Sequence, residues 1–289
     1  MKTCSNLIIN LALLCWIFLN PGKVISVESN QGPFLVLNNP VNAGFGAIFS
    51  SVLSTLHIYD VGNYAGLKID LNSGIYVDPQ HGPNWWNYFF EPIHLGDEKA
   101  PQQIFSDHEV SYLINAGFVI PRPRAFELIQ KYVHLKPPIQ TKIDQFINHE
   151  FKHFFIIGIH HRGTDKKLEA PLVSYETILR HLRWWLAKLK KDTPVKIFVA
   201  TDDQNFLDYL CHLYPGQVCY NKFVRSKDET PLHYNDHLFT GNYQKGEEAI
   251  LDCLLLSKCQ LLLFPAASAF SMASLKFNPD LIAIPLAGN

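Results

Sequence analysis

Residues 149–167, with the sequence HEFKHFFIIGIHHRGTDKK, contain two groups of side chains that could carry out chemistry. The first is His149-Glu150-x-x-His153, in which two histidines on one helix face could share a zinc ion while the glutamate acts on a zinc-bound water. The second is the polar segment 160–166, whose Arg162 offers a planar pair of donors to phosphate oxygens. The surrounding elements must decide between a zinc site and an anion site.

The zinc interpretation requires a helix that continues past His153. The following residues, FFIIGI, are instead typical of a buried strand. A third ligand would have to come from Glu169 or Glu176, and nothing in the pattern marks either one. We therefore expect this stretch to form the last exposed turn of a helix, and we expect no metal site.

Polar residues follow three of the predicted strands, and Arg162 lies in the first of these polar segments. They occupy positions 160–166, 201–203 and 266–269. In open α/β sheets, ligands bind beyond the carboxyl ends of the strands, and the third segment leads into a helix whose N-terminal amides favour an anion. The residues alone leave two interpretations: Arg162 binds a phosphate, or it pairs with Asp165 or Asp202 to close the strand ends.

The second half of the chain alternates between apolar strands and amphipathic helices. Strands are expected within 153–161, 195–203, 216–220, 260–268 and 281–286. This alternation predicts an α/β fold with a doubly wound parallel sheet. The first half is less regular, with a strand, a glycine-containing loop, a helix and a strand within 34–71 and a broken helix within 124–153. We place a domain boundary near residue 150, giving domains 27–150 and 151–289.

Residues 1–26 are expected to be a targeting segment. Lys2 precedes the apolar run Leu7–Leu19, which is shorter than the ~17–25 residues needed to span a bilayer. Val24 and Ser26 would suit a signal-peptide cleavage site. A short signal anchor is the alternative, with membrane association through this segment. The polar shift after the run argues against a third interpretation, a buried helix of the fold.

Composition excludes some classes of protein. A net charge of -1 and a pI near 6.9 give no basic face, so nucleic acid is not an expected partner. Outside the targeting segment, Cys211, Cys219, Cys253 and Cys259 would form one or two disulfides in an oxidising compartment, or remain free buried thiols. The absence of an Asn-x-Ser/Thr sequon slightly disfavours a glycosylated luminal protein.

Three stretches resemble the GDP-fucose-dependent fucosyltransferases, the group of the core α1,6-fucosyltransferase and the nodulation fucosyltransferases. GIHHRGTDK resembles their H-x-R-R-T-D-K motif, and IFVATDDQNFLDYL is similar to their A-T-D-D strand and helix. KGEEAILDCLLLSKCQLLLFPAASAFS resembles their last motif, in which an I-L-D helix leads to a strand and a serine-bearing turn. Before residue 150 the resemblance is limited to NAGFGAIF and WWNYFFEPI. It implies a GT-B-like fold of two Rossmann-type domains, with the acceptor side in the first.

The resemblance assigns donor-binding roles to matching positions. Arg162 would hold the β-phosphate of GDP, and its charge would stabilise the leaving group. Ser268 matches the phosphate-binding serine of the family, and Asp252 matches the aspartate that recognises guanine. His160 would flank the base, and Asp202 would order the loop or contact the donor.

The catalytic positions match the family less closely. Lys166 matches the motif lysine and is assigned to catalysis together with Arg162. The core fucosyltransferases carry, four residues beyond that lysine, a glutamate that deprotonates the acceptor hydroxyl. Here that position is Ala170, and Glu169, one residue earlier, is our candidate general base. The second arginine of the motif is Gly163, so one cationic contact is missing.

We therefore expect an inverting, metal-independent glycosyltransferase that moves fucose from GDP-fucose to a glycan or glycoprotein acceptor and needs no cofactor. Two alternatives stay open: a transferase for another GDP-sugar, or a non-catalytic module that binds GDP-sugars or glycans. The predicted targeting segment places the protein in the secretory pathway or outside the cell that makes it.

Overall fold

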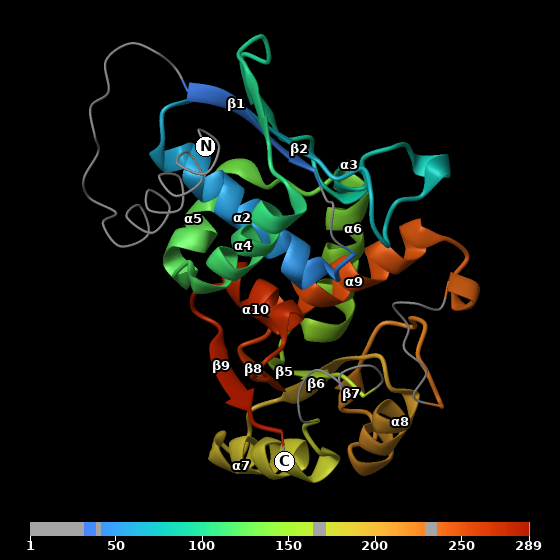
Figure 1. The fold of residues 1–289 in the computed structure, drawn as a ribbon. Coiled ribbons are helices and arrows are strands. Elements are labelled where there is room, and N and C mark those ends of the chain that lie inside the picture. The colour runs from blue at the N-terminus through green and yellow to red at the C-terminus, as the bar shows by residue number, and fades with distance from the viewer. Residues whose placement is uncertain (1–31, 39–41, 164–171, 229–235, 289) are drawn as a thin grey trace.

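The structure is a computed structural model that describes residues 32–38, 42–163, 172–228 and 236–288. Two β-sheets lie at opposite ends of the molecule, with helices between them (Figure 1). The first sheet has the order β3-β2-β1-β4, in which β1 is parallel to β2 and β4 while β3 is antiparallel to β2. Its strands are β1 (Gly32–Asn38), β2 (Tyr64–Asp70), β3 (His94–Gly96) and β4 (Gln102–Ile104).

The second sheet is entirely parallel and has the order β7-β6-β5-β8-β9. Its strands are β5 (Phe155–His161), β6 (Val195–Thr201), β7 (Val218–Cys219), β8 (Leu261–Pro265) and β9 (Ile282–Leu286). The chain winds outward from β5 to β7 and then returns to place β8 on the other side of β5. Helices leaving β5 and β8 therefore diverge to opposite faces, and a crevice opens at that switch point. The predicted doubly wound sheet is confirmed.

The helices of the first half cover its sheet and reach toward the second half. They are α2 (Phe45–Val61), α3 (Trp86–Phe89), α4 (Asp107–Val119), α5 (Arg122–Tyr132) and α6 (Pro137–Phe146), with short turns at η1 (Pro79–His81) and η2 (Ile147–Phe151). No element was predicted between residues 95 and 122, where β4 and α4 lie. A capping box between Ser106 and Glu109 starts α4, because each of the two residues satisfies a backbone N–H of the other.

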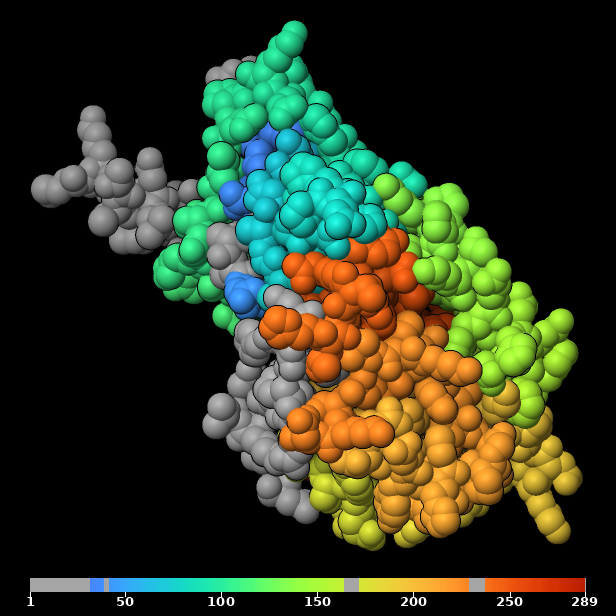
Figure 2. All heavy atoms as spheres, turned by 90° about the vertical axis from the view of Figure 1, so that its right-hand side faces the viewer, coloured from blue at the N-terminus to red at the C-terminus, as the bar shows by residue number. Residues whose placement is uncertain are grey.

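The helices of the second half divide between the two faces of its sheet. They are α7 (Tyr175–Lys188), α8 (Gln204–Leu213), η5 (Asp236–Leu238), α9 (Asn242–Ser257) and α10 (Ala269–Lys276). Ile157 and Ile159 of β5 point to the α7 and α8 side, whereas Ile156 points to the α9 and α10 side. α9 and α10 lie between the two sheets (Figure 1), and Figure 2 shows the orange atoms of α9 between the cyan atoms of the first half and the gold atoms around α8.

One hydrophobic core joins the two halves. Phe49 and Leu53 of α2 belong to the same buried cluster as Leu254 of α9 and Ala273 of α10. A side-chain hydrogen bond reinforces this packing, since the buried Lys276 donates from Nζ to the carbonyl oxygen of Gly117 in α4. Residues 42–44 before α2 and Ser268 before α10 therefore adjoin packed helices, and they line the same cavity.

The cysteine alternatives are resolved in favour of free thiols. Cys211, Cys219, Cys253 and Cys259 all belong to the described residues and form no disulfide, and burial raises the pKa of Cys219 and of Cys253 to about 12. The predicted targeting segment, residues 1–26, lies outside the described residues. Within the part of the chain that the structure describes, no helix combines the length and the apolar character that crossing a bilayer requires.

Candidate active site

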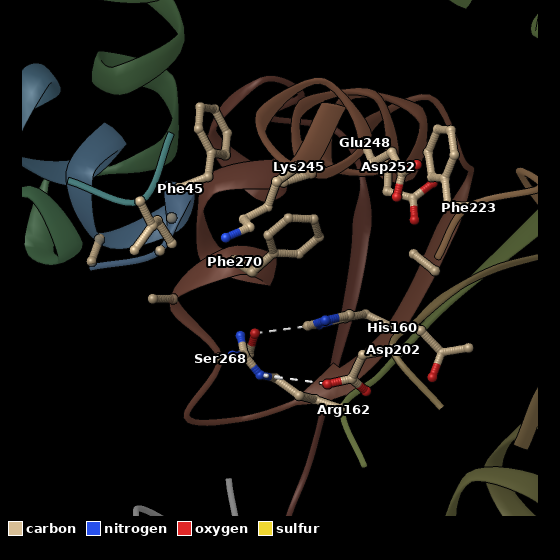
Figure 3. A pocket seen from close by; sticks show the side chains of 18 of the residues that line it. Phe45, His160, Arg162, Asp202, Phe223, Lys245, Glu248, Asp252, Ser268 and Phe270 are labelled. Carbon is tan, nitrogen blue, oxygen red and sulfur yellow. Dashed lines mark hydrogen bonds and ion pairs between the residues drawn. The ribbon is translucent and has the colours of Figure 1, made fainter. Parts of the chain in front are cut away.

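A cavity of about 350 Å³ lies between the carboxyl ends of the strands of both sheets. Its walls include residues 42–47 at the start of α2, the segment after β2, the ends of β5 and β6, one face of α9 and the start of α10. Five residues singled out from the sequence line it: His160, Arg162, Asp202, Asp252 and Ser268 (Figure 3). The fold thus brings together residues from three motifs that are far apart in the sequence.

The pleat of β5 separates the two adjacent histidines at its end. His160 faces α10, where Nδ1 lies 2.6 Å from Ser271 Oγ and the ring packs on Phe270 at a centroid distance of 4.9 Å. His161 faces the other side and packs against Phe206. Burial lowers the pKa of His161 to about 4. His161 is therefore expected to be neutral at physiological pH. Both histidines line the cavity, and His160 is the one that contacts the start of α10.

Arg162 is held at the mouth of the crevice by the end of β6. Its Nε lies 4.0 Å from Asp202 Oδ2, and the other oxygen of Asp202 accepts the backbone N–H of Gly163 at 2.8 Å. The Asp202 carboxylate therefore holds Arg162 and the backbone of Gly163, as the strand-closing interpretation requires. The binding of a phosphate by Arg162 stays a prediction. A carboxylate so engaged is better suited to positioning than to contact with an anionic donor.

Ser268 begins α10 and lies 3% exposed at the cavity wall. Its Oγ accepts the backbone N–H of Ser271 at 3.2 Å and lies 3.3 Å from Nδ1 of His160. The remaining N-terminal amides of α10 and the positive end of its dipole lie beside the cavity. This end of the cavity is therefore suited to an anion.

Asp252 lies on α9, on the opposite side of the cavity from Arg162 and Ser268 in the view of Figure 3. Burial raises its pKa to about 7, even though Asn221 Nδ2 donates a hydrogen bond to Oδ1 at 2.7 Å and Arg225 lies nearby. A buried carboxylate with one hydrogen-bond donor keeps acceptor capacity for a ligand that brings further N–H groups. The N1–H and N2–H groups of guanine match this requirement.

Several cavity residues were not predicted from the sequence, among them Phe45, Tyr76, Lys245 and Glu248. Lys245 and Glu248 share a helix face with Asp252 through i, i+3 and i+7 spacing, and this spacing was a usable signal. Phe45 and Tyr76 belong to the first half, and the Tyr76 hydroxyl accepts the Phe45 backbone N–H at 3.0 Å. No local pattern reveals that contact, because it joins segments separated by a helix and a strand.

The rejected zinc signature has a structural role. His149 and Glu150 lie in the last helical turn before β5. The Glu150 carboxylate accepts a hydrogen bond from Lys196 Nζ at 2.5 Å, and its other oxygen lies 2.8 Å from Nδ1 of His149. His153 follows with a φ of 72° and starts the turn into the strand. Among the described residues, no group of three or more potential ligands could hold a metal ion.

Two of the predicted catalytic residues, Lys166 and Glu169, fall in the segment 164–171, outside the described residues. That segment follows directly after Gly163. The roles of Lys166 and Glu169 therefore stay predictions that rest on the positions of these residues relative to the sequence motif.

The family model of nodulation protein Z (NodZ) matches residues 124–288, more than half of the chain, and this range contains all three motifs. The chain belongs to the NodZ family. It is accordingly a glycosyltransferase of the fucosyltransferase superfamily, as the resemblance implied. Nodulation protein Z of Bradyrhizobium diazoefficiens is 26% identical, over 92% of this chain and 74% of that protein. Its counterpart in Sinorhizobium fredii is 25% identical, over 65% of this chain and 64% of that protein.

Solved structures confirm the GT-B-like fold. NodZ α-1,6-fucosyltransferase co-crystallised with GDP matches with a TM-score of 0.59 at 20% identity, covering 89% of this chain and 96% of that chain. NodZ α-1,6-fucosyltransferase soaked with GDP-fucose matches with a TM-score of 0.57 at 20% identity, covering 86% of this chain and 94% of that chain. POFUT1 in complex with GDP matches with a TM-score of 0.50 at 11% identity, covering 89% of this chain and 99% of that chain. At these identities the likeness concerns the fold alone.

Proposed function

We propose that this NodZ-family enzyme transfers fucose from GDP-fucose to a hydroxyl group of a glycan or glycoprotein. The observation that carries the proposal is the arrangement of charged groups in the cavity. Arg162 and Ser268 lie at one end beside the α10 N-terminus, and the Asp252 carboxylate lies on the other side (Figure 3). A guanine diphosphate nucleotide is complementary to this arrangement, because its base has N–H donors for the carboxylate and its diphosphate has negative charge for the Arg162 end.

Two further observations support this donor. The NodZ structures of the same fold include complexes prepared with GDP and with GDP-fucose. Aromatic rings of Phe45, Phe223, Phe239 and Phe270 line the cavity and offer flat apolar surfaces to a base or sugar. Since Asp252 would recognise the base alone, another GDP-sugar remains the alternative donor.

The proposed reaction is a single displacement at the anomeric carbon of fucose. The acceptor oxygen attacks C1 while the bond from C1 to the β-phosphate oxygen breaks, and the bonding electron pair stays on GDP. The acceptor proton passes to a general base, for which Glu169 is the candidate. Attack opposite the leaving group inverts the configuration at C1.

In this proposal protein groups stabilise the charge that develops on GDP without a metal ion. Arg162 and the N-terminal amides of α10 supply positive charge at the diphosphate end. Fucose transfer is therefore expected to continue undiminished in EDTA, and NMR of the product should show the anomeric configuration opposite to that of the donor. Activity that is lost on chelation and restored by Mg²⁺ or Mn²⁺ would contradict metal independence.

The variant Glu169→Gln tests whether Glu169 is the general base of the transfer reaction. If Glu169 removes the acceptor proton, the variant should transfer fucose about 10²–10⁴-fold more slowly and bind GDP as tightly as the wild type. Steady-state transfer assays and calorimetry measure the two effects separately. Glu176→Gln, an exposed first-turn position of α7, makes the same chemical change as a control.

An unchanged transfer rate in Glu169→Gln would remove Glu169 from the mechanism. A wild-type protein that binds GDP tightly and transfers no sugar from any GDP-sugar would instead favour the non-catalytic binding module. The two results are distinguishable, because only the second lacks wild-type turnover.

We assign the acceptor side to residues 27–150, because residues 42–47 and 75–76 form the part of the cavity wall that the first half contributes. We also propose that residues 1–26 direct the chain into the secretory pathway or out of the cell. N-terminal sequencing of the recovered protein tests this: a start near residue 27 supports a cleaved signal peptide. Retention of residues 1–26 in a membrane fraction supports an anchor.

A further inference from the structure

We propose that Lys245 binds the β-phosphate of the GDP-sugar donor as a second cation beside Arg162. This inference rests on the proposed function and names a residue that none of the three motifs assigns to the donor. Lys245 lies in the second turn of α9, is 4% exposed and lines the cavity. Lysine side chains are rarely buried to this extent.

The distribution of charge around the cavity supports this role. Of the described residues that line it, Arg162 and Lys245 are the two with an arginine or lysine side chain. They come from different elements, the end of β5 and α9, and both side chains extend toward the Ser268 side in Figure 3. A nucleoside diphosphate brings several negative charges into this enclosed space. Burial of those charges is costly unless each phosphate has a charged or hydrogen-bonding partner.

Position 163, directly after Arg162, has no room for a second cationic side chain. A Cβ atom on Gly163 would lie 2.7 Å from Asp203 Oδ2 and 2.9 Å from Asp203 Cβ. Asp203 is fixed in place, because its Oδ1 accepts the backbone N–H groups of Asn205 and Phe206 and its Oδ2 accepts the Tyr175 hydroxyl. Position 163 therefore adds no second charge, and among the described lining residues Lys245 is the lysine or arginine besides Arg162.

The spacing of α9 matches the length of a nucleotide. Lys245 and Asp252 lie on the same helix face and are separated by two turns, or ~10.5 Å along the helix axis. This separation is comparable to the distance from the guanine edge to the terminal phosphate in an extended GDP. If Asp252 accepts the N–H groups of guanine, Lys245 is then placed at the diphosphate. The Phe239 ring, 5.5 Å from Nζ, holds the ammonium group by a cation–π contact.

Lys245→Met tests the proposal by the pattern of nucleotides it affects. Methionine keeps the length and apolar stem of lysine, so the buried site stays filled without a charge. Calorimetry with GDP, GMP and guanosine on the full chain should show GDP affinity reduced by about ten- to a hundred-fold. Guanosine affinity should stay unchanged, so the affinity ratio of GDP to GMP falls. Lys245→Arg should recover part of the GDP affinity.

Lys258→Met serves as the control, since Lys258 is an exposed residue at the end of the same helix and should leave all three affinities unchanged. An equal loss for GDP, GMP and guanosine in Lys245→Met would mean that Lys245 only shapes the cavity, and would overturn the proposal. An unchanged GDP affinity would overturn it as well. Failure of the proposed function looks different, because the folded wild type would then bind no GDP, or would bind GDP and transfer no sugar.

Discussion

Arg162→Ala is expected to weaken GDP binding by about ten- to a hundred-fold, because a charge-assisted hydrogen bond contributes about 1.5–3 kcal/mol. The effect on fucose transfer should be larger. Negative charge grows on the β-phosphate as the bond to C1 breaks, and removal of one such donor typically lowers the rate by about 10²–10³-fold. Calorimetry with GDP and initial-rate assays with GDP-fucose measure the two losses.

Two further variants show whether the effect belongs to the guanidinium group. Arg162→Lys keeps the charge but loses the planar fork, so its transfer rate should lie between those of the wild type and Arg162→Ala. Arg183→Ala removes an exposed arginine from α7 and should change neither quantity. Wild-type transfer by a folded Arg162→Ala protein would show that Arg162 only pairs with Asp202.

Asp252→Asn is expected to stabilise the protein at pH 8. Burial raises the folded-state pKa of Asp252 to about 7, whereas the ordinary value is 3.8. Between these pH values the folded chain holds a proton that the unfolded chain has lost, so stability falls as pH rises through this window. Above pH 7 the full cost remains, on the order of 4 kcal/mol. The asparagine variant avoids this cost, so its free energy of unfolding should exceed that of the wild type at pH 8 and converge with it near pH 4.

The same variant should lose most of its affinity for GDP. An amide nitrogen in place of a carboxylate oxygen presents a donor to the N–H groups of guanine, and an unsatisfied buried donor costs about 1–3 kcal/mol. Wild-type binding should itself weaken by about tenfold for each pH unit below 7, because the neutral Asp252 must release its proton when guanine binds. Calorimetry in buffers of different ionisation enthalpy measures that proton release.

Asp192→Asn, at an exposed turn, is the control for a charge change without burial, and it should alter neither stability nor binding. Denaturant unfolding at pH 5 and pH 8 gives the stability difference. A variant Asp252→Asn that is no more stable than the wild type at pH 8, or that binds GDP normally, would contradict the role given to this carboxylate.

The second half of the fold was predictable because its strands are buried on both faces. Such strands appear as continuous apolar runs, and the predicted stretches 153–161 and 195–203 contain β5 and β6. Ser174 is the N-cap of α7, where its Oγ accepts the Thr177 backbone N–H at 3.2 Å, and a serine directly before an amphipathic run is a helix-start signal in the sequence. Local chemistry was sufficient at these positions.

The region from 95 to 122 shows where local signals become weak. β4 has only three residues, two of them exposed, and it is held by pairing with β1. A strand this short has too few residues to show a period. The capping box of Ser106 and Glu109 is different, because its residue types and spacing do mark the start of α4 in the sequence, although no helix was predicted there.

The candidate site also contains residues that the sequence predicts and residues that it does not. His160 lies near the end of β5, and Arg162 and Ser268 follow the ends of β5 and β8, which is where ligand-binding residues are expected in this class of fold. The wall formed by Phe45 and Tyr76 depends on how the first half packs against α9 and α10. The sequence specifies that packing only through the whole fold, so these residues could not be assigned to the cavity beforehand.

Calorimetric titration of the full chain at pH 8 with GDP, ADP, GDP-fucose and GDP-mannose is the decisive test of a guanine-specific fucose-donor site. We expect sub-millimolar binding of GDP, much weaker binding of ADP because adenine lacks the N–H groups that Asp252 would accept, and tighter binding of GDP-fucose than of GDP-mannose. Equal binding of GDP and ADP, or no GDP binding by the folded protein, would contradict such a site.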